Sequence, residues 1–164
     1  MYSSEWSKLS QEHQSLIRSY QQEFPVKIGG LAKELAIIVR VSTLSAGISG
    51  QIKEEDGTVT IKVNKGETKT RQRFTIAHEI SHFLLHRHLL REGISDDVLY
   101  RSNASDSIEL EANKLAADIL IPEQEYQRVN NELLSSYSGD QLHEKVADYF
   151  GISTTALKKK LGIW

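Results

Sequence analysis

The spacing of hydrophobic residues in the first part of the chain predicts one amphipathic helix followed by three short strands. Residues 4–22 are polar with sparse apolar positions, which suggests a helix with one buried face. The β-branched run at 37–41 predicts a strand. Residues 48–52 and 58–63 predict two antiparallel strands around the turn signal at 55–57. Within 58–63, Val and Ile alternate with Thr and Lys, so one face of this strand is expected to be buried.

The other segments have a helical period. A short helical pattern at 31–35 precedes the strands, and a long helix is expected at about 70–88. A looser stretch separates it from a second helix at about 107–120, which ends before Pro122. From about residue 123 the pattern indicates two or three further helices. The order helix, strand, hairpin, helix, helix is typical of an α+β fold with a small antiparallel sheet.

Composition narrows the class of protein. The 164 residues are 39% hydrophobic and 26% charged, which is ordinary for one globular domain. The formal net charge of −2 shows no basic excess, so we do not expect direct nucleic-acid binding. There is no cysteine, which excludes disulfides and thiolate metal ligands. Without a signal-like start or a long apolar run, the chain is expected to be cytoplasmic, with no membrane partner.

Residues 78–82, with the sequence His-Glu-Ile-Ser-His, place two imidazoles and a carboxylate on one predicted helix. Two His residues four apart lie about one turn from each other on the same face, so both can bind one metal ion. Glu79, between them, can act as a general base on the attacking water. The flanking residues are largely apolar, which favours a buried or cleft-lining site. This is the pattern of a helical zinc-peptidase site.

A catalytic zinc ion takes three protein ligands and keeps one position for water, so the third ligand must come from another segment. Glu109 is the better candidate, because Asn113 lies one turn further on the same face and can hydrogen-bond a ligating imidazole. Glu111 is rotated from Glu109 by about 200° around the helix axis and is the weaker candidate. The helix dipole also favours an acidic residue near a helix N-terminus, so Glu109 has an ordinary structural explanation as well.

Four of the six His residues lie between positions 78 and 88. His86 is about 12 Å along the helix from His78, too far for one zinc ion with bonds of about 2 Å to bind both, together with His82. We interpret His86 as a residue that supports a ligand or the fold. His88 is expected to be exposed near the helix end.

Residues 71–86 closely resemble the active-site helix of the ImmA/IrrE family of metallopeptidases, and residues 108–122 resemble the family's second metal helix. The upstream strand and hairpin and the C-terminal tail fit the same layout, so the resemblance covers roughly residues 25–164. Two departures, Ser81 where Gly is common and Leu115 where Phe is common, remove no functional atom.

The resemblance implies a zinc-dependent endopeptidase with a glutamate as third ligand. It puts His78, His82 and Glu109 on the Zn²⁺ ion and makes Glu79 the catalytic general base. A His/His/Glu set accepts several divalent ions, so these residues by themselves do not select zinc over another metal.

The resemblance also predicts the fold and the division of the chain into parts. The expected fold is α+β, with a small antiparallel sheet packed on a zinc-binding helix pair and a helical C-terminal part. Residues 1–164 would form a single metallopeptidase domain. Its parts would be an N-terminal helix (1–24), a catalytic core (25–122) and the helical C-terminal part (123–164).

Partners follow from the resemblance too. Members of this family usually act on helix-turn-helix transcriptional repressors, often encoded beside them in mobile elements or toxin–antitoxin pairs. We therefore expect a helix-turn-helix (Xre-like) repressor or antitoxin as substrate or binding partner. The alternative is a non-proteolytic binding module, or a toxin that binds a helix-turn-helix partner.

Two questions stay open in the sequence. Residues 142–164 have a helix-turn-helix-like pattern that ends in three lysines, but the net charge favours a tail packed on the catalytic part over a DNA-binding tail. The donor that would stabilise the oxyanion is not identified, with Arg71, Tyr100 and Arg101 available.

Overall fold

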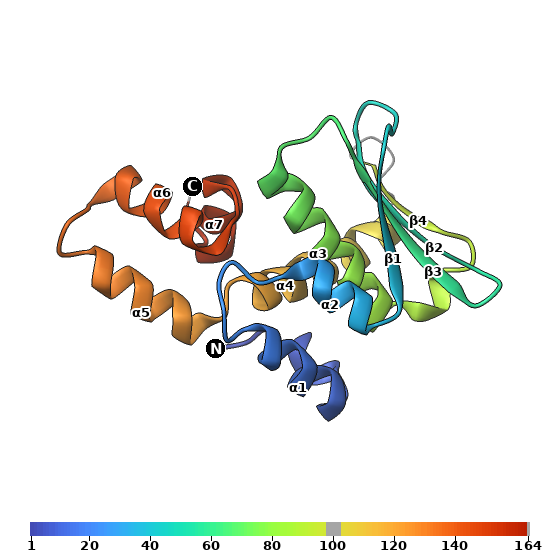
Figure 1. The fold of residues 1–164 in the computed structure, drawn as a ribbon, viewed down its shortest axis with the longest axis horizontal. Coiled ribbons are helices and arrows are strands. Elements are labelled where there is room, and N and C mark those ends of the chain that lie inside the picture. The colour runs from blue at the N-terminus through green and yellow to red at the C-terminus, as the bar shows by residue number, and fades with distance from the viewer. Residues whose placement is uncertain (98–102, 164) are drawn as a thin grey trace.

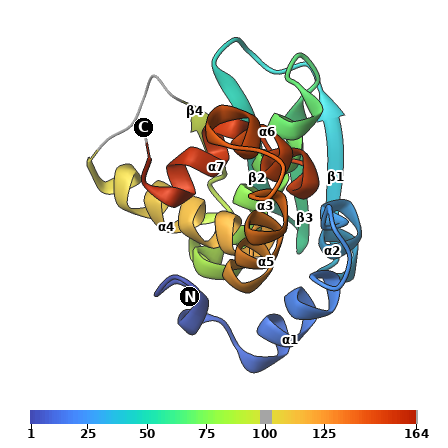
Figure 2. The same cartoon turned by 90° about the vertical axis from the view of Figure 1, so that its left-hand side faces the viewer.

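The computed structural model describes residues 1–97 and 103–163, without the side chains of residues 95–97 and 103–105. Its helices and strands are, in chain order, η1 (Trp6–Lys8), α1 (Gln11–Tyr20), α2 (Ile28–Glu34), β1 (Ile37–Ser42), β2 (Ile48–Glu55), β3 (Thr58–Asn64), α3 (Lys69–Leu85), η2 (Arg87–Leu89), β4 (Ile94–Asp97), α4 (Asn103–Leu120), α5 (Glu123–Leu133), α6 (Gly139–Phe150) and α7 (Thr154–Leu161). The sheet lies at one end of the molecule, with α3 against it, and α5, α6 and α7 gather at the opposite end (Figures 1 and 2).

The strands of the described residues form one mixed sheet in the order β1-β3-β2-β4. The strand β1 pairs with β3 in parallel, while β2 pairs antiparallel with both β3 and β4. The α+β prediction is confirmed, but the expectation of a purely antiparallel sheet is wrong. The hairpin β2–β3 is antiparallel as expected. Its second strand, however, is the one beside β1, so two neighbouring strands run in the same direction.

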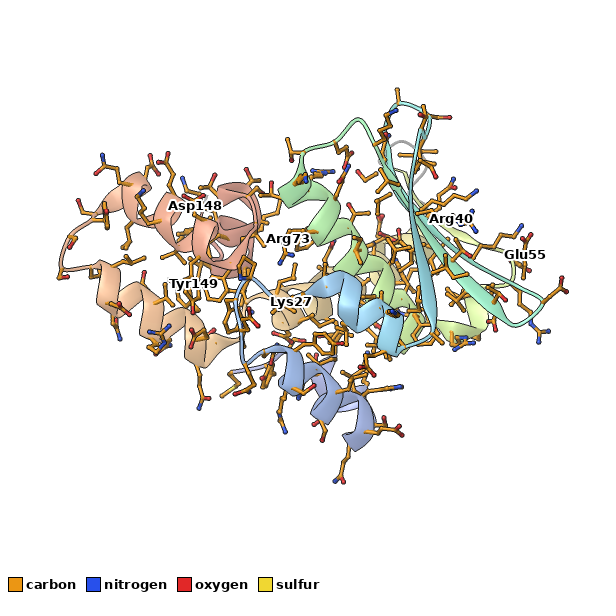
Figure 3. The ribbon with its side chains drawn as sticks, in the orientation of Figure 1. Lys27, Arg40, Glu55, Arg73, Asp148 and Tyr149 are labelled. Atoms are coloured by element: carbon orange, nitrogen blue, oxygen red, sulfur yellow. The ribbon has the colours of Figure 1, made fainter. Side chains whose placement is uncertain are left out.

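One face of this sheet is buried under α3 and the other is open to solvent. On β3, Val59, Ile61 and Val63 are at most 3% exposed, as their alternation with polar residues predicted. On the open face, Arg40 of β1 is paired in register with Lys62 of β3, and its side chain points away from the helices (Figure 3). Because every second side chain of β3 is apolar, the sequence of β3 determines which face of the sheet packs against α3.

The N-terminal segment is not one helix over 4–22. A short 3-10 helix, η1, ends before Leu9, and α1 begins after Ser10. The hydroxyl of Ser10 accepts a hydrogen bond from the backbone N of His13, which makes Ser10 the cap of a new helix. A side chain that caps in this way ends the preceding segment, and the apolar period did not reveal this break.

The helix α3 carries the His-Glu motif, as predicted, but it ends at Leu85 instead of continuing to His88. Thr68 caps its start by accepting from the backbone N of Arg71 at 3.3 Å. Beyond its end, Arg87 belongs to η2 and donates two hydrogen bonds, of 3.0 and 2.8 Å, to Glu54 of β2. This bidentate contact draws the chain after α3 toward the sheet.

The helical C-terminal part is confirmed, as three helices after Pro122. Between α6 and α7, Gly151 has a φ of 64°, the left-handed conformation in which glycine is favoured. Arg73 of α3 donates to the backbone oxygens of Gly151 at 3.0 Å and Val26 at 2.9 Å. Figure 3 shows Arg73 on the side of α3 that faces the C-terminal helices. One guanidinium thus ties α3 to the chain before α2 and to the C-terminal part.

Two segments after α3 differ from the prediction. The helix α4 begins at Asn103, four residues before the expected start at 107, and ends at Leu120 as predicted. The strand β4 lies in a stretch that was expected to be irregular. Within the described residues, no helix has both the length and the apolar composition needed to cross a bilayer.

Candidate metal centre

Helices α3 and α4 pack together and bring three metal-ligating side chains to one point. Nε2 of His78 lies 3.1 Å from Nε2 of His82 and 2.9 Å from Oε2 of Glu109. Nε2 of His82 lies 3.0 Å from Oε1 of Glu109. These are the three residues that the sequence singled out as metal ligands, and they could hold one metal ion.

The close approach of the two helices depends on small side chains. Ala112 and Ala116 are fully buried and lie three and seven residues after Glu109, on the face of α4 that meets α3, so larger residues there would hold the two helices apart. The two departures from the family pattern are also buried, with Ser81 and Leu115 at 0% exposed. The hydroxyl of Ser81 donates to the backbone O of Ala77 at 2.8 Å, so its polar atom is satisfied within α3.

Burial and short contacts determine the charges at this centre. His78, His82 and Glu109 are 2%, 0% and 7% exposed. Burial lowers the pKa of His82, and this outweighs the opposite effect of Glu109, so the imidazole is neutral at pH 7. Burial raises the pKa of Glu109, but the contacts with both imidazoles lower it more, to well below its ordinary range. A neutral imidazole and a carboxylate are the forms that bind metal ions.

Asn113 supports His78 as the sequence predicted. Its Oδ1 lies 2.9 Å from Nδ1 of His78. An amide oxygen only accepts, so this contact places the imidazole proton on Nδ1 and leaves the Nε2 lone pair directed at the centre.

His86 contacts the second imidazole of the centre and lies outside the group of three donors. Its Nδ1 is 2.9 Å from Nδ1 of His82, and its Nε2 is 3.2 Å from Oε2 of Glu111. His86 lies where a residue that supports a ligand or the fold would lie. His88 is exposed as expected. Glu111 does not join Glu109 at the centre but lies beside His86.

Glu79 is fully buried, next to a part of β2 that the sequence did not mark as functional. A Cβ added at Gly50 would lie 3.2 Å from Oε1 of Glu79 and 2.4 Å from Cγ2 of Thr75. Only glycine therefore allows β2 to run so close to this carboxylate. A glycine inside a predicted strand is a known sign of close backbone approach, and this signal was available in the sequence.

Of the candidate oxyanion donors, Arg71 is engaged with neighbouring side chains and the other two lie outside the described residues. Tyr100 and Arg101 belong to the segment that the structure does not describe. Arg71 donates to Oγ of Ser49 at 3.2 Å, and its Nε is 3.4 Å from Oε2 of Glu67. These contacts give Arg71 a structural role between β2 and the start of α3.

The three donors fit a divalent transition-metal ion. A tetrahedral ion with bonds of about 2.0–2.1 Å separates its donor atoms by about 3.3 Å. The observed separations of 2.9–3.1 Å lie within a few tenths of an ångström of that value. Two imidazoles and a carboxylate suit zinc and also other first-row ions, so the donor set does not select the metal.

The lysines of the tail are engaged within the protein. Nζ of Lys158 lies 2.8 Å from Asp140, and Nζ of Lys160 lies 3.3 Å from Asp118. Leu157, one residue before this run, is fully buried. These contacts agree with the expectation of a tail packed on the rest of the chain.

Comparisons with known proteins bear on the fold and the family of this chain. A search of curated proteins finds no match. Among solved structures, a Mycobacterium tuberculosis transcriptional regulator is similar with a TM-score of 0.64 and 14% sequence identity, over 99% of this chain and 48% of the regulator. The chain thus spans about half the length of that regulator, and the likeness shows the fold alone. A family model described as the IrrE N-terminal-like domain of M78 peptidases matches residues 32–162. Because this match covers most of the chain, the protein belongs to the IrrE N-terminal-like (M78) family, a membership that implies a metallopeptidase.

Proposed function

We propose that this chain is a zinc-dependent endopeptidase that cleaves a helix-turn-helix transcriptional repressor or antitoxin, with residues 1–164 acting as one metallopeptidase domain. The observation that carries the proposal is the convergence of His78, His82 and Glu109 within 3.1 Å of one another, beside Glu79. Family membership supports the class of reaction. The choice of substrate rests on the resemblance to a family whose members act on such repressors.

In this proposal His78, His82 and Glu109 hold the ion, and Glu79 moves the proton. When bound, the metal supplies Lewis acidity that polarises the scissile carbonyl and makes water a better nucleophile at neutral pH. Glu79 accepts a proton from the water as its oxygen bonds to the carbonyl carbon. Glu79 then donates that proton to the amide nitrogen as the C–N bond breaks. Asn113 keeps His78 oriented throughout, through the contact of 2.9 Å.

The alternative is a binding module or toxin that engages a helix-turn-helix partner without cleaving it. One observation favours it, because His78, Glu79, His82 and Glu109 are at most 7% exposed. A site closed to this degree could hold α3 and α4 together while the partner binds elsewhere on the surface.

The test is an intact-mass measurement on a helix-turn-helix regulator encoded beside this chain, incubated with the zinc-loaded protein. Glu79→Gln keeps the shape of the side chain but cannot accept the proton, so turnover should fall by about 10²–10⁴-fold while zinc content is unchanged. Glu55→Gln is the matched control, because Glu55 lies on the exposed end of the hairpin, away from α3 (Figure 3).

The outcomes separate the two candidates. Fragments produced by the wild type and by Glu55→Gln, but not by Glu79→Gln, support the peptidase. Full cleavage by Glu79→Gln would rule out the proton transfer described above. A regulator that stays intact yet co-elutes with the zinc-loaded protein would favour the binding module or toxin.

A further inference from the structure

A chain of polar contacts runs from the candidate metal centre to the N-terminal segment. Nδ1 of His82 lies 2.9 Å from Nδ1 of His86, and Nε2 of His86 lies 3.2 Å from Oε2 of Glu111. The same carboxylate oxygen lies 3.2 Å from Nζ of Lys8. The contacts therefore connect α3, α4 and η1 in that order.

The protons along this chain have one arrangement that suits metal binding. Nε2 of His82 faces Glu109 at 3.0 Å and needs its lone pair there to bind an ion. The proton of His82 then sits on Nδ1 and is donated to Nδ1 of His86. His86 accordingly holds its own proton on Nε2 and donates it to Glu111. Lys8 can only donate hydrogen bonds, so Glu111 is the acceptor in its contact with Lys8. Glu111 is also the acceptor that this arrangement of protons requires for His86.

Buried neighbours on both sides hold Lys8 in place. Trp6 and Leu9 are 5% and 6% exposed, so η1 is packed onto the protein around Lys8. Further along α4, the carboxylate of Asp118 accepts from the backbone N of Ser3 at 2.8 Å. The segment that leads into η1 is thus attached to α4, and the side chain of Lys8 extends from η1 to Glu111.

We propose that Lys8, Glu111 and His86 are positioning residues of the metal centre. They hold the imidazole of His82 with its proton on Nδ1 and its Nε2 directed at the ion, and so raise the affinity for the metal. The family match begins at residue 32, so Lys8 contributes from a segment that the family model does not include. The inference rests on the proposed function, which supplies the metal, and deepens it.

Four variants of the full chain test the inference. Glu111→Ala removes the acceptor of His86, and Lys8→Met removes the charge at the end of the chain. Lys114→Met is the matched control: Nζ of Lys114 lies 4.0 Å from Glu5, so this pair also joins α4 to the N-terminal segment. Lys8 and Lys114 have nearly equal side-chain exposure, 49% and 47%. In the described part of the chain, Lys8 is the one of these two lysines that contacts Glu111.

Zinc affinity is measured by competition with a chromophoric chelator. Loss of a group that supports a ligand lowers metal affinity by about 10–100-fold, and Glu111→Ala should lose at least tenfold. Lys8→Met should lose about two- to fivefold, because solvent weakens the effect of a half-exposed charge. Lys8→Arg should retain the wild-type affinity, and Lys114→Met should leave it unchanged.

A second readout does not depend on metal. Nitrogen-15 NMR of the metal-free full chain reports which nitrogen of His82 carries the proton. In the metal-free chain Glu109, at 3.0 Å, competes for a proton on Nε2 of His82. The fraction of His82 with its proton on Nδ1 should therefore be larger in the wild type than in Glu111→Ala. A role of Glu111 in stability alone would lower the unfolding temperature without moving this proton.

The failures of the two proposals are distinguishable. If Lys8→Met and Glu111→Ala bind zinc as tightly as Lys114→Met, with the His82 proton unmoved, the positioning role is wrong while the peptidase proposal stands. If the wild type binds no zinc, the proposed function fails. The NMR result on Glu111→Ala then still decides whether the chain orients His82.

Discussion

Replacing Gly50 by alanine tests the packing of β2 on the active-site helix. The added Cβ would lie 2.4 Å from Cγ2 of Thr75 and 3.2 Å from both Oε1 of Glu79 and the backbone O of Lys62. Non-bonded carbons in well-packed interiors are separated by about 3.5–4.0 Å, so the first contact must lengthen by about 1 Å. Thr75 is 3% exposed and cannot simply turn into solvent. We therefore expect a shift of β2 away from α3.

The size of the effect follows from two opposing contributions. Overpacking of a close contact costs about 1–3 kcal/mol. Alanine also restricts the unfolded chain more than glycine, which stabilises the folded state by about 0.4–1 kcal/mol. The net loss should be about 1–2 kcal/mol. For a chain of 164 residues this lowers the midpoint of thermal unfolding by about 2–8 °C.

Thermal and urea unfolding of the metal-free chain measure this loss, with two controls. Gly29→Ala, on α2, meets nothing within 4 Å and should be neutral or stabilising by up to about 1 kcal/mol. Thr75→Ser removes Cγ2 and keeps the hydroxyl, so the double variant with Gly50→Ala should recover part of the loss. A Gly50→Ala protein as stable as the wild type, or a double variant with no recovery, would refute the argument from close contact.

Three further predictions concern the surroundings of the centre. Asn113→Ala should lower zinc affinity by about 10–100-fold, because Nδ1 of His78 loses its partner at 2.9 Å, and chelator competition that finds wild-type affinity would contradict this. Arg73→Met should cost about 1.5–3 kcal/mol in urea unfolding, because a charged group loses two hydrogen bonds. Arg40→Met, whose side chain has no polar partner among the described residues, should stay within about 0.5 kcal/mol, and an equal loss in both variants would argue against the role of Arg73. Burial lowers the pKa of His82 below its ordinary 6.5, so the unfolded metal-free chain takes up this proton at higher pH than the folded one. This contribution to stability is present above pH 6.5 and is lost as the pH falls toward the folded-state pKa, and a urea midpoint unchanged between about pH 7.5 and 5.5 would exclude it.

Local geometry was determined by the sequence alone. The spacing of His78 and His82 places them on one face of α3, because the pitch of a helix leaves no other arrangement for residues four apart. The alternation along β3 predicted its buried face for the same kind of reason. The partnership of Asn113 with an imidazole also followed from its position one turn after Glu109. The first two features depend only on residues within one element, and for Asn113 the spacing predicted the shared face with Glu109, while its contact with His78 also needs α4 to pack on α3.

What the tertiary structure decided involves elements far apart in the chain. The parallel pairing of β1 with β3 depends on which strand of the β2–β3 hairpin lies beside β1. The hydrophobic pattern of β1 would be the same beside either strand, so it does not predict the direction of pairing. Which of Glu109 and Glu111 reaches the centre depends on the rotation of α4 about its axis as it packs on α3. The contact of Lys8 with α4 depends on the docking of η1. Helix and strand periods are properties of local backbone geometry, whereas docking is determined by the packing of surfaces that only the folded chain brings together.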